Sequence, residues 1–182
     1  MKTLTVCTTL VILTAAGLSA QTPAPADTGY TATLRASWNS VKRYVVASAE
    51  KMPEANYAFK PTPEVRSFGE LLTHVAGASY EFCASAKNEK APFAEDAFEK
   101  KTMNKADIVK VTNDAIAYCD AAFAALTDAN AGTMVKPAFG GEGQTRRVSS
   151  LVGQIGHDNE HYGNMVTYFR LKGLVPPSSR PR

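Results

Sequence analysis

The sequence predicts an all-α protein built as a four-helix bundle, and three observations lead to this prediction. Apolar residues recur at intervals of three and four over four segments, which is the spacing of one helix face. These segments are bounded by capping residues, prolines or glycines, and none of them shows the alternating pattern of a strand. With 182 residues, 45% of them hydrophobic and 20% charged, the chain is long enough to bury the core of a single domain.

Residues 1–20 are a separate unit with the layout of a secretory signal peptide. Lys2 precedes an apolar run over residues 6–16, and small residues lead up to Ala20. The run is too short to span a membrane, and a buried N-terminal helix is the alternative interpretation. We expect cleavage after Ala20 and export to the periplasm or the extracellular space, with no membrane span in the mature chain.

A Pro/Ala linker over residues 21–29 separates this leader from the bundle, which we assign to residues 30–182. The first helix is expected over about residues 32–52, and Pro53 ends it because proline cannot continue a helix. The apolar residues that repeat at helical spacing are Leu34, Trp38, Val41 and Val45. The next segment, NYAFKPTPEV, contains two prolines and is expected to be an extended connection.

The second helix is expected to begin after Ser67, in the sequence SFGE. The Ser67 hydroxyl can accept a hydrogen bond from the first turn while the Glu70 carboxylate reaches back, which is a capping box. The helical pattern fades near Lys87. The apolar face consists of Phe68, Leu71, Val75 and Phe82.

Two more helices complete the bundle. Asn104 and Asp107 offer a start for the third, and the fourth is expected over about residues 148–172, with Gly173 as its stop. The third helix has the apolar stripe Ile108, Val111, Ala115, Ala122 and Leu126, and the fourth has Leu151, Ile155, Tyr162, Val166 and Phe169. The glycine-rich FGGEGQTRR at residues 139–147 lacks the context of a phosphate loop and is interpreted as a flexible turn.

The connection over about residues 88–103 is long for two adjacent antiparallel helices. If it crosses over, the second and third helices run parallel, and Cys83 and Cys119 lie at the same end of the bundle. In a simple up-down hairpin the two cysteines would be roughly two to three turns apart. A disulfide between them is therefore conditional on the crossover.

The charge of the chain excludes one class of partner. Its net charge is +3, and removal of Lys2 with the leader lowers this to +2. No segment concentrates the basic residues that a phosphate backbone requires, so we do not expect nucleic acid binding.

The chain has three histidines, and two of them, His157 and His161, lie four residues apart in the fourth helix. Residues at this spacing project from the same side of a helix, so both imidazoles can reach one ion. Neutral imidazole is a good ligand for zinc, nickel, copper or iron. His74 in the second helix is the remaining candidate for a third ligand, and a hydrogen-bonded boundary histidine is the alternative interpretation for it.

Four polar residues are candidates for contact with these rings or with a substrate. Gln154, Asn164 and Tyr168 lie on the same shoulder of the fourth helix as the histidine pair, and Glu70 lies one turn before His74. The alternative for Glu70 is that capping occupies it fully. Asp158 and Glu160 flank the pair and are interpreted as surface charges.

These segments resemble the DinB-like superfamily of bacterial four-helix-bundle proteins. The matching stretches are SFGELLTHVAG and HDNEHYGNMVTYFRLKGLVPP, together with YAFKPTPEVRSFGELLTHV. The resemblance implies an up-down-down-up course and a divalent metal, with zinc, nickel or iron as candidates, held by His74, His157 and His161. Some members of the family transfer low-molecular-weight thiols or isomerise substrates with a thiol cofactor.

Two functions stay open at this point. One is an exported metal-dependent hydrolase or group transferase, in which the metal acidifies water, activates a thiolate or polarises a carbonyl of an unknown small molecule. The other is a non-catalytic bundle that binds a metal or small ligand, for example in a stress response. A homodimer through an apolar outer face could use Tyr44, Tyr80 and Tyr118, although aromatic residues at helical spacing more often belong to a core.

Overall fold

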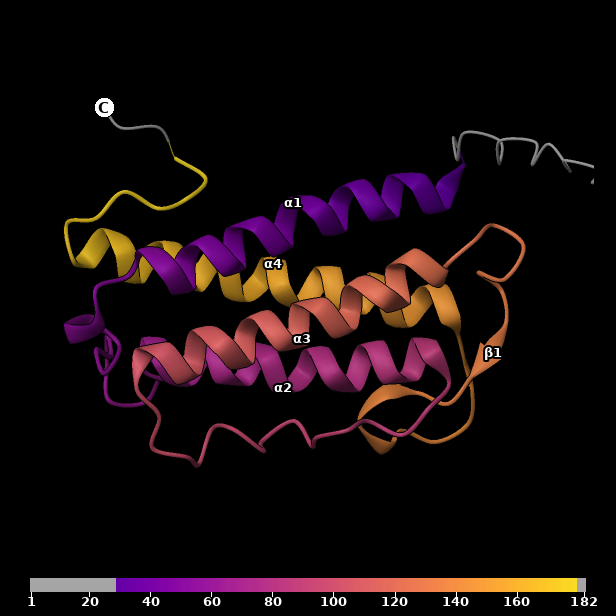
Figure 1. Ribbon diagram of the computed structural model, residues 1–182, viewed down its shortest axis with the longest axis horizontal. Helices are drawn as coiled ribbons and strands as arrows, with labels where there is room; N and C mark the ends of the chain where they lie inside the picture. Colours follow the sequence, from indigo (N-terminus) through magenta and orange to yellow (C-terminus); the bar gives the residue numbers. More distant parts are fainter. Residues whose placement is uncertain (1–28, 180–182) are drawn as a thin grey trace, which may run out of the picture.

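A computed structural model describes residues 29–179, and over that range the chain forms four α-helices (Figure 1). The helices are α1 (Tyr30–Lys51), α2 (Phe68–Lys87), α3 (Lys105–Ala125) and α4 (Arg147–Leu171). Their ends agree with the sequence predictions to within about two residues, the usual uncertainty of a helix boundary. The predicted signal peptide and all but the last residue of the predicted linker lie outside the described residues.

The helices run up, down, down and up, which confirms the predicted four-helix bundle. In Figure 1, α1 and α4 run in one direction, while α2 and α3 run side by side in the other. The connection from α2 to α3 runs back along the whole length of the bundle (Figure 1). This crossover makes α2 and α3 parallel neighbours.

The helix caps predicted from the sequence are formed in the structure. The backbone N–H of Glu70 donates to the Ser67 hydroxyl at 3.2 Å, and the Ser67 N–H donates to the Glu70 carboxylate at 2.7 Å. Asn104 caps α3 by accepting from the backbone N–H of Asp107 at 2.9 Å. Gly173 follows α4 with a φ of +68°, a conformation that suits glycine.

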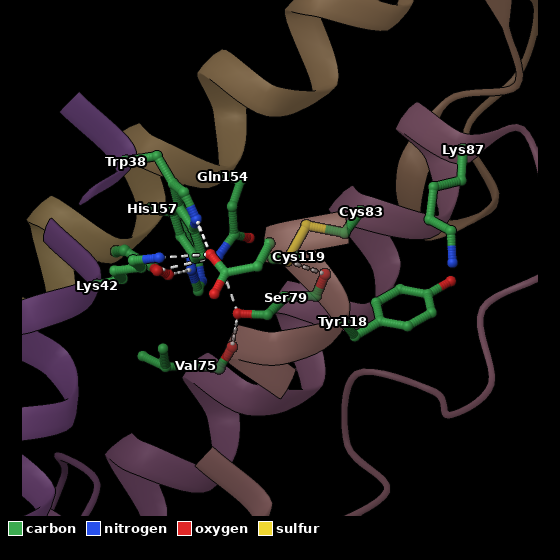
Figure 2. Close-up of a disulfide and its surroundings, with 12 residues drawn as sticks. Trp38, Lys42, Val75, Ser79, Cys83, Lys87, Tyr118, Cys119, Gln154 and His157 are labelled. Carbon is green, nitrogen blue, oxygen red and sulfur yellow. Dashed lines mark hydrogen bonds and ion pairs between the residues drawn. A yellow bond between two sulfur atoms is a disulfide. The ribbon is translucent and has the colours of Figure 1, made fainter. Parts of the chain in front are cut away.

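Parallel packing of α2 and α3 brings two cysteines together. Cys83 and Cys119 form a disulfide with their Cα atoms 5.3 Å apart, and Figure 2 shows the bridge beside Ser79 and Gln154. The condition set by the sequence, a crossover between the second and third helices, is thus met.

The core is lined by aromatic contacts between helices. The rings of Trp38 and Phe123 stack at 4.7 Å between α1 and α3, and Tyr44 stacks on Tyr162 at 4.9 Å between α1 and α4. Tyr80 and Tyr118 lie 5.1 Å apart between α2 and α3. The three tyrosines considered for a dimer therefore have partners inside the molecule, and the dimer stays a prediction.

The buried face of α4 differs from its predicted apolar stripe. Ile155 and Val166, which the stripe included, are only half-buried. Since α1 and α2 both pack on α4, its buried arc is wide and takes in polar positions. Its buried residues are Ser150, Leu151, Gln154, Asp158, His161, Tyr162, Met165, Tyr168 and Phe169.

The segment between α3 and α4 contains a small hairpin that the sequence analysis does not predict. Strands β1 (Met134–Val135) and β2 (Thr145–Arg146) pair antiparallel, and the one-turn helix η2 (Ala138–Gly140) lies between them. A second one-turn helix, η1 (Glu54–Asn56), follows α1. Over residues 29–179, no helix combines the length and the apolarity that a membrane crossing needs.

The crossover passes very close to α2 at Gly77. A Cβ atom built on Gly77 would lie 1.9 Å from the backbone oxygen of Glu95, a distance that real atoms do not show. Only glycine allows the backbone of the connection to approach the helix this closely.

Replacing Gly77 with alanine should therefore destabilise the fold. The backbone of the connection must move away from α2, and overpacking of this kind costs about 1–3 kcal/mol. Urea unfolding followed by circular dichroism measures the loss. Gly163→Ala is the matched control, because among the described residues nothing lies within 4 Å of a Cβ atom there, and alanine should stabilise this exposed helix position by up to about 1 kcal/mol. Equal effects of the two substitutions would contradict the close approach at Gly77.

Candidate metal centre

The three histidines lie together between α2 and α4. His74 comes from α2, and His157 and His161 come from successive turns of α4. The Nε2 atom of His157 lies 3.2 Å from Nε2 of His74 and 3.0 Å from Nε2 of His161. One ligand atom from each ring lies within 4.8 Å of the other two. Residues 83 positions apart in the chain thus direct their ring nitrogens at one point.

This arrangement fits a divalent transition metal. With metal–nitrogen bonds of about 2.0–2.1 Å, neighbouring ligands lie about 3.0 Å apart in an octahedral shell and about 3.4 Å apart in a tetrahedral one. The spacings of 3.0 and 3.2 Å agree with both shells. Nitrogen donors of this type suit zinc, nickel or iron, and the geometry does not choose among them. The cluster could therefore hold a metal ion.

Burial keeps two of these rings neutral, which is the form that binds a metal. His74 is 6% exposed and His161 8% exposed. Burial, reinforced by the nearby His157 and His74, lowers the pKa of His161 from 6.5 to about 3. Burial also lowers the pKa of His74, and the hydrogen bond with Glu99 partly opposes that shift. Neutral imidazoles keep the lone pairs that a metal needs.

Glu99 orients the His74 ring, and the sequence analysis did not find this residue. Its Oε1 lies 2.8 Å from Nδ1 of His74, on the side of the ring that faces away from the other histidines. The Nε of Arg66 donates to Oε2 of the same carboxylate at 3.0 Å. A carboxylate on the second nitrogen of a ligating histidine fixes the tautomer that leaves Nε2 free for the metal. Glu99 lies in the crossover connection, where no helical repeat marks it.

Asp158 is buried, so its interpretation as a surface charge is wrong. Its side chain is 0% exposed, and burial raises the pKa of its carboxyl group. Oδ2 accepts a hydrogen bond from Nε2 of Gln154 at 3.0 Å. Oδ1 lies 3.6 Å from Nδ1 of His157, and within residues 29–179 neither of these two buried atoms has a hydrogen-bond partner. Asp158 thus faces His157 as Glu99 faces His74. Glu160, by contrast, is exposed, as expected.

The predicted contact residues have different roles. Gln154 is fully buried and donates to Ser79 at 2.8 Å (Figure 2). It also donates to Asp158 and approaches the histidines through that residue. The amide of Asn164 lies 3.4 Å from Nδ1 of His161. Tyr168 donates its hydroxyl proton to the backbone carbonyl of Arg66. Glu70 caps α2 and pairs with Lys60 at 3.1 Å, which agrees with the capping alternative.

A cleft opens beside His161. It has a volume of about 710 Å³, and Arg66, Glu160, Asn164 and Tyr168 contribute to its walls. Three of these residues come from α4, and Arg66 comes from the segment before α2. A small molecule in this cleft would lie next to the histidine cluster.

Comparisons with known proteins agree with this fold. The family model of the DinB superfamily matches residues 34–165. A crystal structure of a DinB-like protein from Bacillus cereus is 17% identical with a TM-score of 0.66, covering 81% of this chain and 95% of that one. A DinB-like protein from Bacillus subtilis is 18% identical with a TM-score of 0.60, covering 82% and 96%. No curated protein sequence matches the chain.

A third solved structure is an enzyme. It is a point mutant of a mycothiol-dependent maleylpyruvate isomerase, 14% identical with a TM-score of 0.61, covering 74% of this chain and 60% of the isomerase chain. At this identity the likeness concerns the fold alone.

Asp158→Asn should weaken metal binding about 10- to 100-fold, the usual effect of losing such an orienting partner. Gln154 donates to one side of the carboxyl group, so asparagine would turn its NH₂ toward the Nδ1–H of a metal-bound His157. Competition with a chromogenic chelator measures the affinity. Glu160→Gln, which changes an exposed carboxylate two residues away, should leave it unchanged. Equal affinities of the two variants would argue against an orienting role for Asp158.

The metal-free protein should lose stability as the pH falls below about 6.5. The pKa of His161 is 6.5 in the unfolded chain and about 3 in the folded one, so the unfolded chain binds more protons between these values. The contribution of neutral His161 to the free energy of unfolding is fully present above pH 6.5 and decreases toward pH 3. Urea unfolding at pH 7 and pH 5 measures it, and His161→Gln should show a smaller loss. The prediction would be contradicted if His161→Gln lost as much unfolding free energy between pH 7 and pH 5 as the native protein does.

Proposed function

The chain belongs to the DinB superfamily, and we propose that it is an exported metal-dependent enzyme, a hydrolase or group transferase acting on a small molecule. In this proposal His74, His157 and His161 hold one divalent transition metal ion. The observation that carries the proposal is the convergence of three imidazole nitrogens beside an open cleft, with Nε2 of His157 3.2 Å from that of His74 and 3.0 Å from that of His161.

Three protein ligands are the number typical of catalytic sites, because they leave a coordination position for water or substrate. When bound, the metal supplies Lewis acidity, which stabilises negative charge that develops on a reacting oxygen or sulfur. The cleft of about 710 Å³ next to His161 provides room for the substrate at this position.

The residues of the chain have distinct tasks in this scheme. Glu99 and Asp158 face the Nδ1 atoms of His74 and His157, and in this scheme they hold the two rings in position. Asn164 presents its exposed amide at the cleft and can bind a polar group of the substrate. Burial raises the pKa of Tyr168, so its hydroxyl keeps its proton, which it donates to the backbone of Arg66. Tyr168 therefore shapes the cleft wall.

Hydrolysis and thiol transfer both remain consistent with this site. Similarity to a mycothiol-dependent isomerase supports thiol chemistry, since that enzyme shares the fold. Export favours hydrolysis, because low-molecular-weight thiols are mainly cytoplasmic. The predicted leader supports export, and the Cys83–Cys119 disulfide is in keeping with it since disulfides persist in oxidising compartments.

A non-catalytic metal-binding module is the second candidate. The burial of His74 and His161 favours it, because closed positions are typical of metals that stabilise a fold. In that case the metal would raise the melting temperature, and no substrate would turn over.

His161→Ala should abolish retention of the metal with little loss of helicity. Removing one of three ligands leaves an incomplete site, while α4 keeps its apolar contacts. Elemental analysis of mature protein purified without a histidine tag measures metal content, and circular dichroism measures helicity. Asn159→Ala, an exposed change on the same helix, is the control and should keep the native content. Full occupancy in His161→Ala would overturn the assignment.

The same two variants test catalysis. Native protein and Asn159→Ala should turn over at least one member of a panel of esters, amides and thiol–electrophile pairs, and His161→Ala should not. Turnover by none of the three, with metal bound to the native protein, would favour the non-catalytic module.

A further inference from the structure

We propose that Phe139 and Phe82 form an aromatic wall on the His157 side of the metal centre, and that this wall selects substrates whose metal-binding group carries an aromatic ring. The proposal rests on the proposed function, because it assumes a metal with an open position. It concerns residues that neither the histidine cluster nor the cleft beside His161 includes.

A series of aromatic rings leads from the histidine cluster toward solvent. The ring centroid of Phe82 lies 5.7 Å from that of His157. Phe139 then packs edge to face on Phe82, with centroids 4.8 Å apart. Phe139 is 43% exposed, so its ring is available to a ligand while it stays anchored on Phe82.

Phe139 is held in a conformation that a bulky side chain rarely adopts. Its φ of 57° and ψ of 29° lie in the left-handed region, which costs free energy for any residue with a Cβ atom. Its backbone N–H donates to the Glu81 carboxylate at 3.2 Å, and the hairpin of β1 and β2 closes the loop around it. Strained backbone positions of this kind cluster at functional sites.

Gly153 of α4 lets the wall approach the helix backbone. Phe82 packs directly on the backbone at Gly153, where a Cβ atom would lie only 2.8 Å from its ring. At Gly156, which precedes His157, nothing among the described residues lies within 4 Å of a Cβ position. Val152, one turn before Gly156, adds an exposed apolar side chain. The face of α4 next to His157 is therefore covered by the Phe82 ring at Gly153 and carries no side chain at Gly156.

The two sides of the metal centre differ in composition. The cleft beside His161 combines polar residues such as Arg66 and Asn164 with apolar residues such as Val65 and Leu71. The His157 side offers the edges and faces of two phenyl rings. A substrate that fits both has a polar reacting group at the metal and an aromatic substituent directed at Phe139, since aromatic pairs gain affinity beyond simple burial.

Two hydroxamates test this inference in the Zn²⁺-loaded protein. Acetohydroxamate and benzohydroxamate present the same metal-binding group, and only the second carries a phenyl ring. Isothermal titration calorimetry gives both affinities, and their ratio isolates the effect of the ring. Phe139→Ala should lower the affinity for benzohydroxamate about two- to tenfold and leave that for acetohydroxamate unchanged.

Phe93→Ala is the matched control. Phe93 is 42% exposed and packs on Tyr80 at 5.0 Å, so it resembles Phe139 in exposure and contacts but lies in the crossover connection. It should leave the ratio of the two affinities unchanged. Phe139→Gly is a second variant that removes the ring without backbone strain, and it should behave as Phe139→Ala does.

The outcomes distinguish the aromatic wall from the metal centre. An unchanged ratio in both Phe139 variants, or the same change in Phe93→Ala, would overturn the aromatic wall while leaving the metal centre intact. Failure of native Zn²⁺-loaded protein to bind either hydroxamate would overturn the open metal position and with it this inference.

Discussion

The passage of the crossover connection over Gly77 is the constraint on which much of this structure depends. Because the connection returns along the bundle, α2 and α3 run parallel, and Cys83 meets Cys119. The same connection carries Glu99 to the outer nitrogen of His74. A single close approach of two backbones therefore links the topology, the disulfide and the orientation of one histidine ring. A hairpin of ordinary length could provide none of these three features.

The electrostatics of the centre are those of a site prepared for a cation. Burial makes protonation of His74 and His161 unfavourable, so the cluster carries little positive charge of its own. Carboxyl groups lie behind two of the rings, Glu99 behind His74 and Asp158 behind His157. A divalent ion at the shared point would accept the lone pairs of the unprotonated nitrogens. Its positive charge would offset the negative charge of the nearby acidic groups. The buried unpaired atoms of Asp158 and His157 are understandable on this basis, since metal binding at Nε2 makes Nδ1 a hydrogen-bond donor.

Much of this architecture could be predicted from the sequence, because local rules determine helix ends. Ser67, Glu70 and Asn104 form the caps that their positions predict. The pairing of His157 with His161 could be predicted because residues at i, i+4 spacing share a helix face. His74 was grouped with them because it is the one remaining histidine and because the family resemblance implies a three-histidine site. The family resemblance supplied the up-down-down-up course that the residues alone left open, and the DinB superfamily match agrees with it.

What could not be predicted depends on tertiary contacts. Asp158 was expected at the surface because a helical wheel built on apolar residues underestimates the arc that two neighbouring helices, α1 and α2, bury on α4. Glu99 and Phe139 lie in connections without periodicity. Only the fold brings Glu99 to His74, and Phe139 to the Phe82 ring that lies beside His157. The close approach at Gly77 could not be predicted, since a glycine within a helical pattern can have several structural causes.

Anomalous diffraction from crystals of the untagged mature protein, recorded at the absorption edge of the metal that it retains, tests the central claim most directly. We expect one strong peak about 2.1 Å from the Nε2 atoms of His74, His157 and His161. A protein that retains no metal, or a peak that involves only one of these rings, would contradict the three-histidine metal centre.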